Sequence, residues 1–412
     1  MITEFCRLND AIERVSKVIN IQLNIERVSL LNAIGRVAAK DVTSPCDIPP
    51  YDRSVVDGYA VRAEDTYGAS PSNPLPLRIV GEANFDTAFR YSIGPGEAVR
   101  IHTGVPLPKG ANAVIMLEDV VEDKSTIYVM KSVGVYANVS RRGEDMPKGF
   151  TILKRGQTIE PWHVAALAAV GLDEVEVFER LRLCLLTVGD EIVEPSKNLD
   201  PVEVLSKGKV FSSTHYLLLC EAKRLGFLEP VHIGIVGDSP HQISNHIRQA
   251  IEECHSVITT GGTGPGQRDV VVKAVKEVGS EVVVRGIAMR PGRTTSVAVL
   301  KGKPIFMLSG FPVAAYIAFR FFVIPSLTKA LGITESRNYV YAKLTRRVVN
   351  RAGYTTFVRV KLFNCGTEVC AEPLASTGSG LISTLLESNG ILKLPDDIEG
   401  YEAGELVPIE LL

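Results

Sequence analysis

A glycine-rich segment is the first part of this sequence whose residues could bind a ligand directly. Residues 259–269 read TTGGTGPGQRD, and glycines leave the backbone free to approach a bound group closely. The amides of such a loop can hold a phosphate, although a tight connection between a strand and a helix has the same composition. The segment matches neither a dinucleotide-binding fingerprint nor a P-loop. We predict phosphate contacts at Gly261, Gly262, Thr263 and Gly264.

Acidic residues follow three expected strands in succession. Asp190 and Glu191 follow the first strand, Asp238 follows the second and Asp269 follows the third. Carboxylates at strand ends suit Mg²⁺, which prefers carboxylate oxygens together with substrate phosphates. Each acid also has a plainer interpretation, because Asp238 and Asp269 could cap the next helix and Glu191 could lie in a solvated turn. Since three consecutive strand ends carry acids, we favour a functional role for Glu191, Asp238 and Asp269, in contact with a metal ion or a ribose.

Two arginines around a turn could bind an oxyanion. Arg290 and Arg293 flank a Pro-Gly turn, and their guanidinium groups offer forked hydrogen-bond donors. Exposed arginine pairs are common, so an ordinary surface turn is an equal alternative. The helix expected after Pro312 adds an N-terminus, which favours anions.

Charged and turn-forming residues also gather in three segments of the N-terminal half. Residues 49–62 include Asp57, residues 100–106 include Thr103, and residues 141–146 include Asp145. Each segment could belong to a site or to an ordinary surface, and periodicity does not decide between the two.

The histidines show no pattern that indicates chemistry. His215 and His246 lie on expected helices without a ligand partner four residues later, so we interpret both as structural. No Ser-His-Asp arrangement has supporting context, which leaves nucleophilic hydrolysis weakly supported.

These residues need a framework of strands and helices to position them. From about residue 181 to 332 the sequence alternates strands and helices, beginning with an almost unbroken apolar run. This alternation predicts an α/β sandwich with a largely parallel sheet. Ligands of such sheets bind at the carboxyl ends of the strands. The predicted strands are 181–188, 232–236, 256–260, 281–287 and a hairpin of 296–300 with 304–308; the predicted helices are 213–225, 240–253, 269–278 and 313–331.

The regions on either side of this α/β part have a β texture. Up to about residue 180, short β-type runs alternate with turns rich in Pro and Gly, interrupted by one helix at 161–170. After about residue 335, runs at 339–345, 356–363 and 368–372 predict a small barrel or sandwich. The sequence therefore predicts a multidomain protein of α/β and β parts.

Composition excludes several classes of protein. Lys and Arg number 45 and Asp and Glu number 47, so the net charge is −2, which argues against a dedicated nucleic-acid binder. No apolar run approaches the roughly 20 residues that cross a bilayer, and the N-terminus reads as an amphipathic helix rather than a secretion signal. We therefore expect a cytoplasmic protein without a membrane partner.

The seven cysteines show neither a C-x-x-C pair nor a spacing typical of zinc sites. Cys184 and Cys220 lie in apolar segments, so we expect both to be buried thiols. An odd count without a disulfide framework indicates a reducing compartment.

Eight segments together resemble one protein family. In chain order they are PPYDRSVVDGYAVR, RIHTGVPLPKGANAVIM, RRGEDMPKG, LLTVGDEI, GIVGDSP, TTGGTG with RD, MRPGR and LSGFPVAA. This is the order seen in molybdopterin molybdotransferases, the MoeA and gephyrin E-domain family. The resemblance covers essentially the whole chain.

The resemblance implies a subunit of four parts. They are an N-terminal helix with an elongated β-rich domain (1–45 and 146–180), an inserted small β domain (46–145), a MogA-like α/β domain related to molybdopterin adenylyltransferases (181–332) and a C-terminal β-barrel (335–412). The resemblance also implies a homodimer, with a cleft lined by the α/β domain of one subunit and the β domains of the other.

The family takes adenylylated molybdopterin and molybdate, inserts the metal at the dithiolene and releases AMP, using magnesium. The resemblance implies the same reaction here, with molybdate or tungstate, as the final step of molybdenum cofactor biosynthesis after hand-over from a molybdopterin adenylyltransferase. Position by position, it implies cleft residues Asp57, Thr103, Asp145, Glu191, Asp238 and Asp269. It implies an oxyanion pocket of Arg290, Pro291, Arg293, Arg359 and Ser379.

The chain departs from the family pattern at three places. Its phosphate loop reads Gly-Gly-Thr-Gly-Pro-Gly instead of Gly-Gly-x-Ser-x-Gly, which is nearer the adenylyltransferases. Residues 309–312 replace a Pro-Gly-Asn-Pro turn, and residues 212–214 replace Asp-x-Asn. Two alternatives stay open: adenylyl transfer to molybdopterin, and a non-catalytic scaffold of the gephyrin E-domain type.

Overall fold

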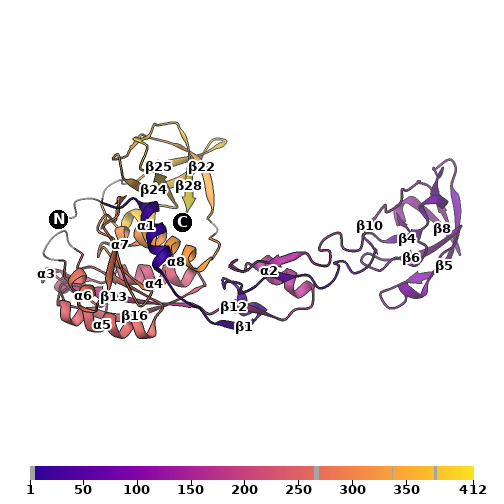
Figure 1. Ribbon diagram of the computed structural model, residues 1–412. Helices are drawn as coiled ribbons and strands as arrows, with labels where there is room; N and C mark the ends of the chain where they lie inside the picture. The colour runs from indigo at the N-terminus through magenta and orange to yellow at the C-terminus, as the bar shows by residue number, and fades with distance from the viewer. Residues whose placement is uncertain (1–4, 264–268, 336, 375–377) are drawn as a thin grey trace. The chain divides into compact units, whose positions relative to one another are not determined.

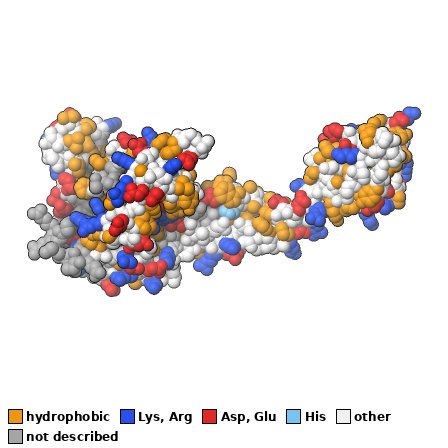
Figure 2. Space-filling view, turned by 90° about the horizontal axis from the view of Figure 1, so that it is seen from above, with side chains coloured by type: hydrophobic (Ala, Val, Ile, Leu, Met, Phe, Trp, Pro, Cys, Tyr) orange, Lys and Arg blue, Asp and Glu red, His pale blue; other side chains and the backbone are white. Residues whose placement is uncertain are grey.

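The computed structural model describes residues 5–263, 269–335, 337–374 and 378–412. The chain forms two compact units. The larger unit comprises Met1–Lys40, Arg155–Glu160 and Val175–Leu412, and the smaller unit comprises Asp41–Lys154 and Pro161–Glu174. On the face shown in Figure 2, basic and acidic side chains are interspersed over each unit, as the near-balanced charge leads one to expect.

A six-stranded sheet forms the centre of the larger unit (Figure 1). Its order is β16 (Leu228–Val236), β13 (Leu181–Val188), β17 (Ser256–Thr260), β21 (Lys303–Leu308), β20 (Ser296–Leu300) and β18 (Glu281–Arg285). The first four strands are parallel, and the last two join antiparallel. The predicted mostly parallel sheet and its hairpin are therefore confirmed.

Alternate residues of the central strands face two separate apolar cores. Leu183 and Leu185 of β13 face one core, which contains residues of α1 (Leu8–Val18), α4 (Thr214–Arg224), α7 (Pro312–Ala318) and α8 (Ile324–Leu331). Cys184 and Leu186 face the other core, which contains residues of α5 (Pro240–Glu253) and α6 (Val270–Glu277). Helices on both faces explain why β13 is apolar along nearly its whole length.

The segment Pro312–Leu331 is long and apolar enough to cross a membrane by length and composition alone. It runs through α7, the π-helical turn η5 (Phe319–Val323) and α8. The expectation that no apolar run approaches this length was therefore wrong. Its most apolar window is 78% buried, because the helix packs in the first core of the larger unit.

Five strands close a barrel at the C-terminal end of the chain. β24 (Thr355–Cys365) pairs with β25 (Glu368–Pro373), which pairs with β22 (Tyr339–Leu344), then β28 (Leu406–Leu411), then β26 (Gly390–Leu394), which returns to β24. Val358, Val360, Leu392, Val407 and Ile409 fill its interior. The predicted barrel is confirmed, and β19 (Met289–Arg290) attaches the α/β part to β24.

Shorter elements complete the larger unit. They are β1 (Ile25–Ser29), paired with β12 (Glu174–Phe178), β14 (Ile192–Val193), paired with β15 (Val210–Phe211), β23 (Val348–Val349), paired with β27 (Gly400–Tyr401), the helices α3 (Pro201–Ser206) and α9 (Ser383–Glu387), and the 3-10 turn η1 (Leu30–Ala33).

The smaller unit is built on a second six-stranded sheet. Its order is β7 (Ala113–Met116), β4 (Gly58–Val61), β6 (Glu97–Ile101), β5 (Leu75–Ala83), β9 (Thr126–Val129) and β8 (Val120–Asp123). Two short pairs join β10 (Val139–Ser140) to β3 (Arg53–Ser54) and β11 (Thr151–Leu153) to β2 (Val42–Thr43). The helix α2 (Pro161–Ala169) and the 3-10 turns η2 (Ala63–Thr66), η3 (Ala88–Arg90) and η4 (Leu117–Asp119) complete it.

Candidate functional site

Four parallel strands of the larger unit end at one edge of the sheet, and the loops that follow them touch one another. The Gly189 amide donates to the Val236 carbonyl at 3.0 Å, and the Gly261 amide donates to the Leu308 carbonyl at 3.2 Å. Gly261 has φ +89°, and a side chain there would collide with the Val188 carbonyl oxygen. Glycine is therefore required for the loop to pass this close to the neighbouring strand.

Carboxylates from two of these loops gather at this edge. Asp190 and Glu191 follow β13, Asp238 follows β16, and the Asp238 amide donates to Asp190 Oδ1 at 3.2 Å. Partial burial, together with the negative charges of Asp190 and Glu191, raises the pKa of Asp238. The structure thus brings the predicted Glu191 and Asp238 together and adds Asp190, which the sequence placed there without assigning it a role.

Capping does not explain Asp238. The residue that caps α5 is Ser239, whose hydroxyl accepts from the Gln242 amide at 3.5 Å. The Asp238 side chain is exposed and does not cap α5. A ligand role is thereby left open for it.

Asp269, in contrast, has the structural role that the sequence allowed as an alternative. It is 4% exposed and caps α6, because its Oδ1 accepts from the Val272 amide at 3.0 Å. Its Oδ2 lies 2.5 Å from an Arg285 nitrogen. Both carboxylate oxygens are therefore engaged, and this geometry gives no support to Asp269 as a metal ligand.

The described part of the glycine-rich loop packs between β21 and α6. Thr263 donates its hydroxyl to the Leu308 carbonyl at 3.4 Å. Gly262 has φ +64°, and a side chain there would meet Val271. Gly264 lies outside the described residues. The predicted phosphate contacts at these positions stay a prediction.

The start of α7 links this edge to a second group of predicted residues. Gly310 lies against Gly261, since a Cβ on Gly310 would be 3.3 Å from the Gly261 Cα. The amides of Val313 and Ala314 donate to the Ser379 carbonyl at 3.1 and 3.3 Å. These two amides of the first helical turn are therefore already bonded to the protein. They are not available to the anion that the sequence suggested for this helix N-terminus.

The predicted oxyanion residues of the 290–293 turn also lie beside α7. Arg290 is half-buried on β19, where it pairs with Thr356 of β24, and the Arg290–Pro291 peptide is cis. A Cβ on Gly292 would lie 3.4 Å from the Ala314 carbonyl oxygen. Arg293 is exposed. The 290–293 turn and the Ser379 loop therefore meet the same helical turn.

Arg359 is the most unusual residue of this group. Its side chain on β24 is 1% exposed; Nε donates to the Thr384 hydroxyl at 3.2 Å and Nη1 to the Phe357 carbonyl at 3.5 Å. Nη2 is buried without a hydrogen-bond partner among the described residues. Burial lowers the pKa of this guanidinium. A buried cation with a free donor is costly, so an anion would suit it well.

The predicted residues of the smaller unit fall into two places. Asp57 accepts from the Thr103 amide at 2.8 Å and from its hydroxyl at 3.1 Å. These two bonds, with a smaller effect of His102, hold the pKa of Asp57 below its ordinary value. Asp145 is exposed in the loop after β10, where its amide donates to the Ile48 carbonyl at 3.2 Å.

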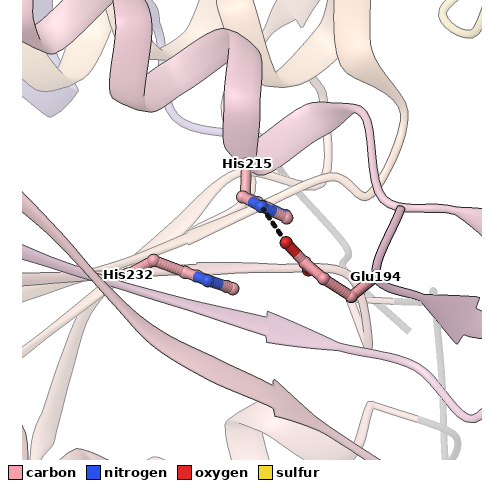
Figure 3. A group of neighbouring side chains, drawn as sticks. All are labelled: Glu194, His215 and His232. Atoms are coloured by element: carbon pink, nitrogen blue, oxygen red, sulfur yellow. Dashed lines mark ion pairs between the residues drawn. The ribbon is translucent and has the colours of Figure 1, made fainter. Parts of the chain in front are cut away.

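One group of side chains was missed by the sequence analysis. Glu194, His215 and His232 converge within the larger unit (Figure 3), with one ligand atom from each lying within 4.8 Å of the others. His215 had been interpreted as structural. The three residues come from separate elements, so no spacing in the sequence could have linked them.

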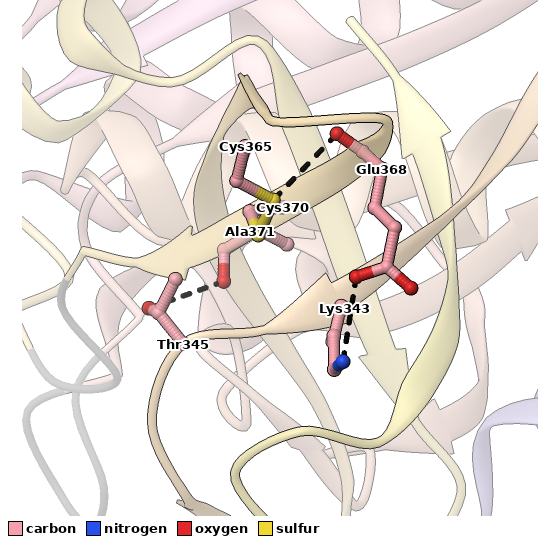
Figure 4. The surroundings of a disulfide bond; sticks show 6 residues. All are labelled: Lys343, Thr345, Cys365, Glu368, Cys370 and Ala371. Atoms are coloured by element: carbon pink, nitrogen blue, oxygen red, sulfur yellow. Dashed lines mark hydrogen bonds and ion pairs between the residues drawn. A yellow bond between two sulfur atoms is a disulfide. The ribbon is translucent and has the colours of Figure 1, made fainter.

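The cysteines also differ from expectation. Cys184 forms a disulfide with Cys254 and is not a thiol, and Cys220 is exposed rather than buried. A second disulfide joins Cys365 to Cys370 across the β24–β25 hairpin, beside an ion pair of Lys343 and Glu368 at 3.3 Å (Figure 4). The expectation of no disulfide framework was therefore wrong.

Family models match almost the whole chain. Residues 6–171 match the MoeA N-terminal region (domain I and II), residues 184–329 match a probable molybdopterin binding domain, and residues 341–412 match the MoeA C-terminal region (domain IV).

Individual proteins are similar over their full length. A putative molybdopterin biosynthesis protein of Methanocaldococcus jannaschii is 37% identical over 97% of this chain and 95% of its own. A molybdopterin molybdenumtransferase of Staphylococcus aureus is 31% identical over 97% and 94%. The crystal structure of the molybdopterin biosynthesis moeA protein of Pyrococcus horikoshii matches with a TM-score of 0.85 at 32% identity, over 99% of this chain and 100% of that one.

Proposed function

We propose, since this chain belongs to the MoeA family of molybdenum cofactor biosynthesis, that it is a molybdopterin molybdotransferase. It inserts molybdate or tungstate into adenylylated molybdopterin and releases AMP. The observation that carries this proposal is a pair of unmet charges within one unit. Clustered carboxylates lie at the sheet edge, and the buried guanidinium of Arg359 lies against the outer face of the barrel, beside α9.

The oxyanion is held at the barrel end of the site. Arg359 offers a desolvated guanidinium with a free donor, a group that a tetrahedral dianion matches in both charge and hydrogen bonding. Its partner Thr384 donates onward to the Leu381 carbonyl at 2.7 Å, which ties Arg359 to the loop that carries Ser379. Arg290, Pro291 and Arg293 supply the other side, because their turn meets the same first turn of α7 as Ser379.

The phosphates of the pterin substrate are held at the sheet edge. Gly261, Gly262, Thr263 and Gly264 are the proposed contacts, and at Gly261 and Gly262 the backbone passes too close to its neighbours for a side chain. Asp269 has a positioning role, since it caps the helix that follows this loop and bonds Arg285.

Mg²⁺ fits the carboxylates of the same edge. Partial burial and the negative charges of Asp190 and Glu191 raise the pKa of Asp238, and a divalent cation would relieve the repulsion among these carboxylates. Glu191 and Asp238, with Asp190, are therefore the residues that would hold the ion. When bound, Mg²⁺ neutralises phosphate oxygens and stabilises a leaving phosphate.

Asp57, Thr103 and Asp145 of the smaller unit complete the cleft in a homodimer, in our proposal. The bonds from Thr103 keep Asp57 ionised, as a residue that contacts a metal or a polar substrate requires. Light scattering on the purified chain tests the dimer, and a monomer at micromolar concentration would contradict this part. Adenylylated molybdopterin arrives from a molybdopterin adenylyltransferase.

A mass-resolved turnover assay tests the proposal. The full-length chain is incubated with adenylylated molybdopterin, Mg²⁺ and either molybdate or tungstate, and we expect metal-loaded pterin and AMP. A second arm supplies ATP and unmodified molybdopterin. If adenylylated molybdopterin forms in the second arm and the first arm gives no metal-loaded pterin, adenylyl transfer is favoured. If neither product forms, a non-catalytic scaffold is favoured.

A further inference from the structure

Three metal-ligating side chains meet at a place that the proposed reaction does not use. Glu194 follows β14, His215 lies in the first turn of α4, and His232 lies in the middle of β16 (Figure 3). The Nε2 atom of His215 is 3.6 Å from Glu194 Oε1. One donor atom from each of the three residues lies within 4.8 Å of the other two.

Each of the three side chains has a further hydrogen-bond partner in the protein. His215 Nδ1 lies 2.5 Å from the Ser212 hydroxyl, which leaves Nε2 facing Glu194. The His232 ring has a backbone hydrogen bond at Gly234. Tyr216 donates its hydroxyl to Glu194 Oε1 at 2.6 Å, the oxygen that also faces His215. The Thr187 hydroxyl lies 3.4 Å from His232 Nε2. Metal-binding histidines and carboxylates are usually held by outer partners of this kind, which fix the tautomer and the ring orientation.

The rings are kept in the form that binds metals. His215 is 1% exposed, and its ring stacks on that of His232 with centroids 4.0 Å apart and planes 6° from parallel. Burial lowers the pKa of both imidazoles. Burial thus favours the uncharged form of both rings, which is the form of imidazole that binds metals.

We propose that Glu194, His215 and His232 bind a divalent transition metal ion of the zinc type. Two imidazole nitrogens and one carboxylate oxygen form a ligand set that zinc accepts, with a water molecule in the fourth position. To bind, the two stacked rings tilt so that their lone pairs meet at the ion. Glu194 is 47% exposed, so the ion enters from its side.

The proposed ion is distinct from Mg²⁺ at the sheet edge. Mg²⁺ selects oxygen ligands, whereas imidazole nitrogen favours zinc and its neighbours. By joining the segment after β14 to α4 and β16, a zinc ion would hold the chain just beyond Glu191 in place. This site is independent of the proposed molybdotransferase activity. If the chain binds no zinc, the proposed activity still stands, since zinc binding is measured without turnover.

Calorimetric titration of Zn²⁺ into the untagged, metal-stripped full-length chain tests this site. We expect one ion per chain with a dissociation constant in the micromolar range or below. Glu194→Gln, His215→Gln and His232→Gln should each weaken the affinity by about tenfold or more. Because Glu194 is largely exposed, Glu194→Gln keeps the fold even if a histidine variant does not.

His241→Gln is the matched control. His241 is exposed on α5, and its Nε2 contacts Asn245 at 3.3 Å. Its replacement should leave Zn²⁺ affinity unchanged. The visible absorption of bound Co²⁺ separates this site from the free thiols of Cys6, Cys46 and Cys220, because thiolate ligands add a charge-transfer band. No Zn²⁺ binding, or equal binding by the chain and Glu194→Gln, would overturn the proposal.

Discussion

The two ends of the candidate site carry opposite unmet charges. At the sheet edge, partial burial and then the negative charges of Asp190 and Glu191 raise the pKa of Asp238. On the outer face of barrel strand β24, Arg359 is buried with a guanidinium nitrogen for which no described residue is an acceptor, and burial lowers the pKa of this guanidinium. The charge at the first end is negative, and the charge at the second end is positive. The difference indicates which kind of ligand each end receives.

Buried charges elsewhere in the same unit are balanced. Arg320 contacts Glu410 at 2.8 Å and Glu221 at 3.2 Å, and Arg337 contacts Glu410 at 3.1 Å. Such a network holds the fold together and needs no ligand. Arg359 and Arg320 can therefore be compared directly: we propose that Arg359 binds the substrate, whereas the contacts of Arg320 stabilise the fold. The following predictions separate these two roles.

Arg359→Met should produce the largest loss of activity. Removing a preorganised donor to an anion typically lowers turnover by about 100-fold or more, while stability should hold or increase because an unpaired buried charge is replaced by an apolar chain. Turnover of adenylylated molybdopterin and chemical denaturation measure the two effects. A large drop in stability together with intact turnover would reverse the assignment.

Arg320→Met should show the converse. It removes one arginine from the buried carboxylates of Glu410 and Glu221, which keep Arg337 and Arg224 as partners. The free energy of unfolding should therefore fall, but by less than the about 3–5 kcal/mol that a fully broken buried pair costs. At a low temperature at which the Arg320→Met variant is still folded, its affinity for the oxyanion should equal that of the unmodified chain. The comparison fails if Arg320→Met and Arg359→Met destabilise the chain equally.

Asp238→Asn should weaken Mg²⁺ binding by about tenfold without loss of stability, as the removal of one carboxylate from a metal site does. Like-charge repulsion with Asp190 and Glu191 disappears, so the free energy of unfolding should stay equal or increase. Calorimetric titration of Mg²⁺ measures the affinity. An unchanged affinity would remove Asp238 from the metal site, and Glu191→Gln repeats the test at its neighbour.

Asp269→Ala should destabilise the chain by about 1–2 kcal/mol, because α6 loses its cap and Arg285 loses its partner. Asp238→Ala is the matched control, since Asp238 caps no helix and its removal should change stability by less than about 0.5 kcal/mol. Urea denaturation of both variants compares them. Equal stabilities would mean that Asp269 is not the structural acid of the pair.

Thr103→Val should have the smallest effect. It removes the hydroxyl bond to Asp57 and keeps the amide bond, so the pKa of Asp57 should rise part of the way to its ordinary value. Because these bonds depress the folded pKa, their stabilisation is present above the unfolded pKa and is lost as the pH falls through the folded one. NMR titration of the carboxyl carbon measures the change, and Thr103→Ser, which keeps a hydroxyl, should leave the pKa unaltered.

The parts of the fold that the sequence predicted are those with a local pattern. The apolar run of β13 and the helices that follow each strand have a period that reveals them. Strand ends then placed Glu191 and Asp238 at a common edge, because parallel strands end on the same side. The site roles of Arg359 and Ser379 were predicted only from the family resemblance.

The parts that the sequence did not predict depend on distant residues. Asp269 and Arg285 form an ion pair although the whole of α6 separates them in the sequence. The partners of Arg359 include Thr384, which is 25 residues further along the chain. The Cys184–Cys254 bridge spans 70 residues. Local periodicity carries no information on such contacts, so neither the burial of a charge nor its lack of a partner could be predicted.

Titration of tungstate into the full-length chain and into Arg359→Met is the most direct measurement of the central claim. If the buried guanidinium is the oxyanion site, the unmodified chain binds tungstate and Arg359→Met loses at least about tenfold in affinity, since charged hydrogen bonds of this kind contribute about 1.5–3 kcal/mol. Arg320→Met should bind as the unmodified chain does. Equal tungstate affinity in the chain and in Arg359→Met would contradict the account.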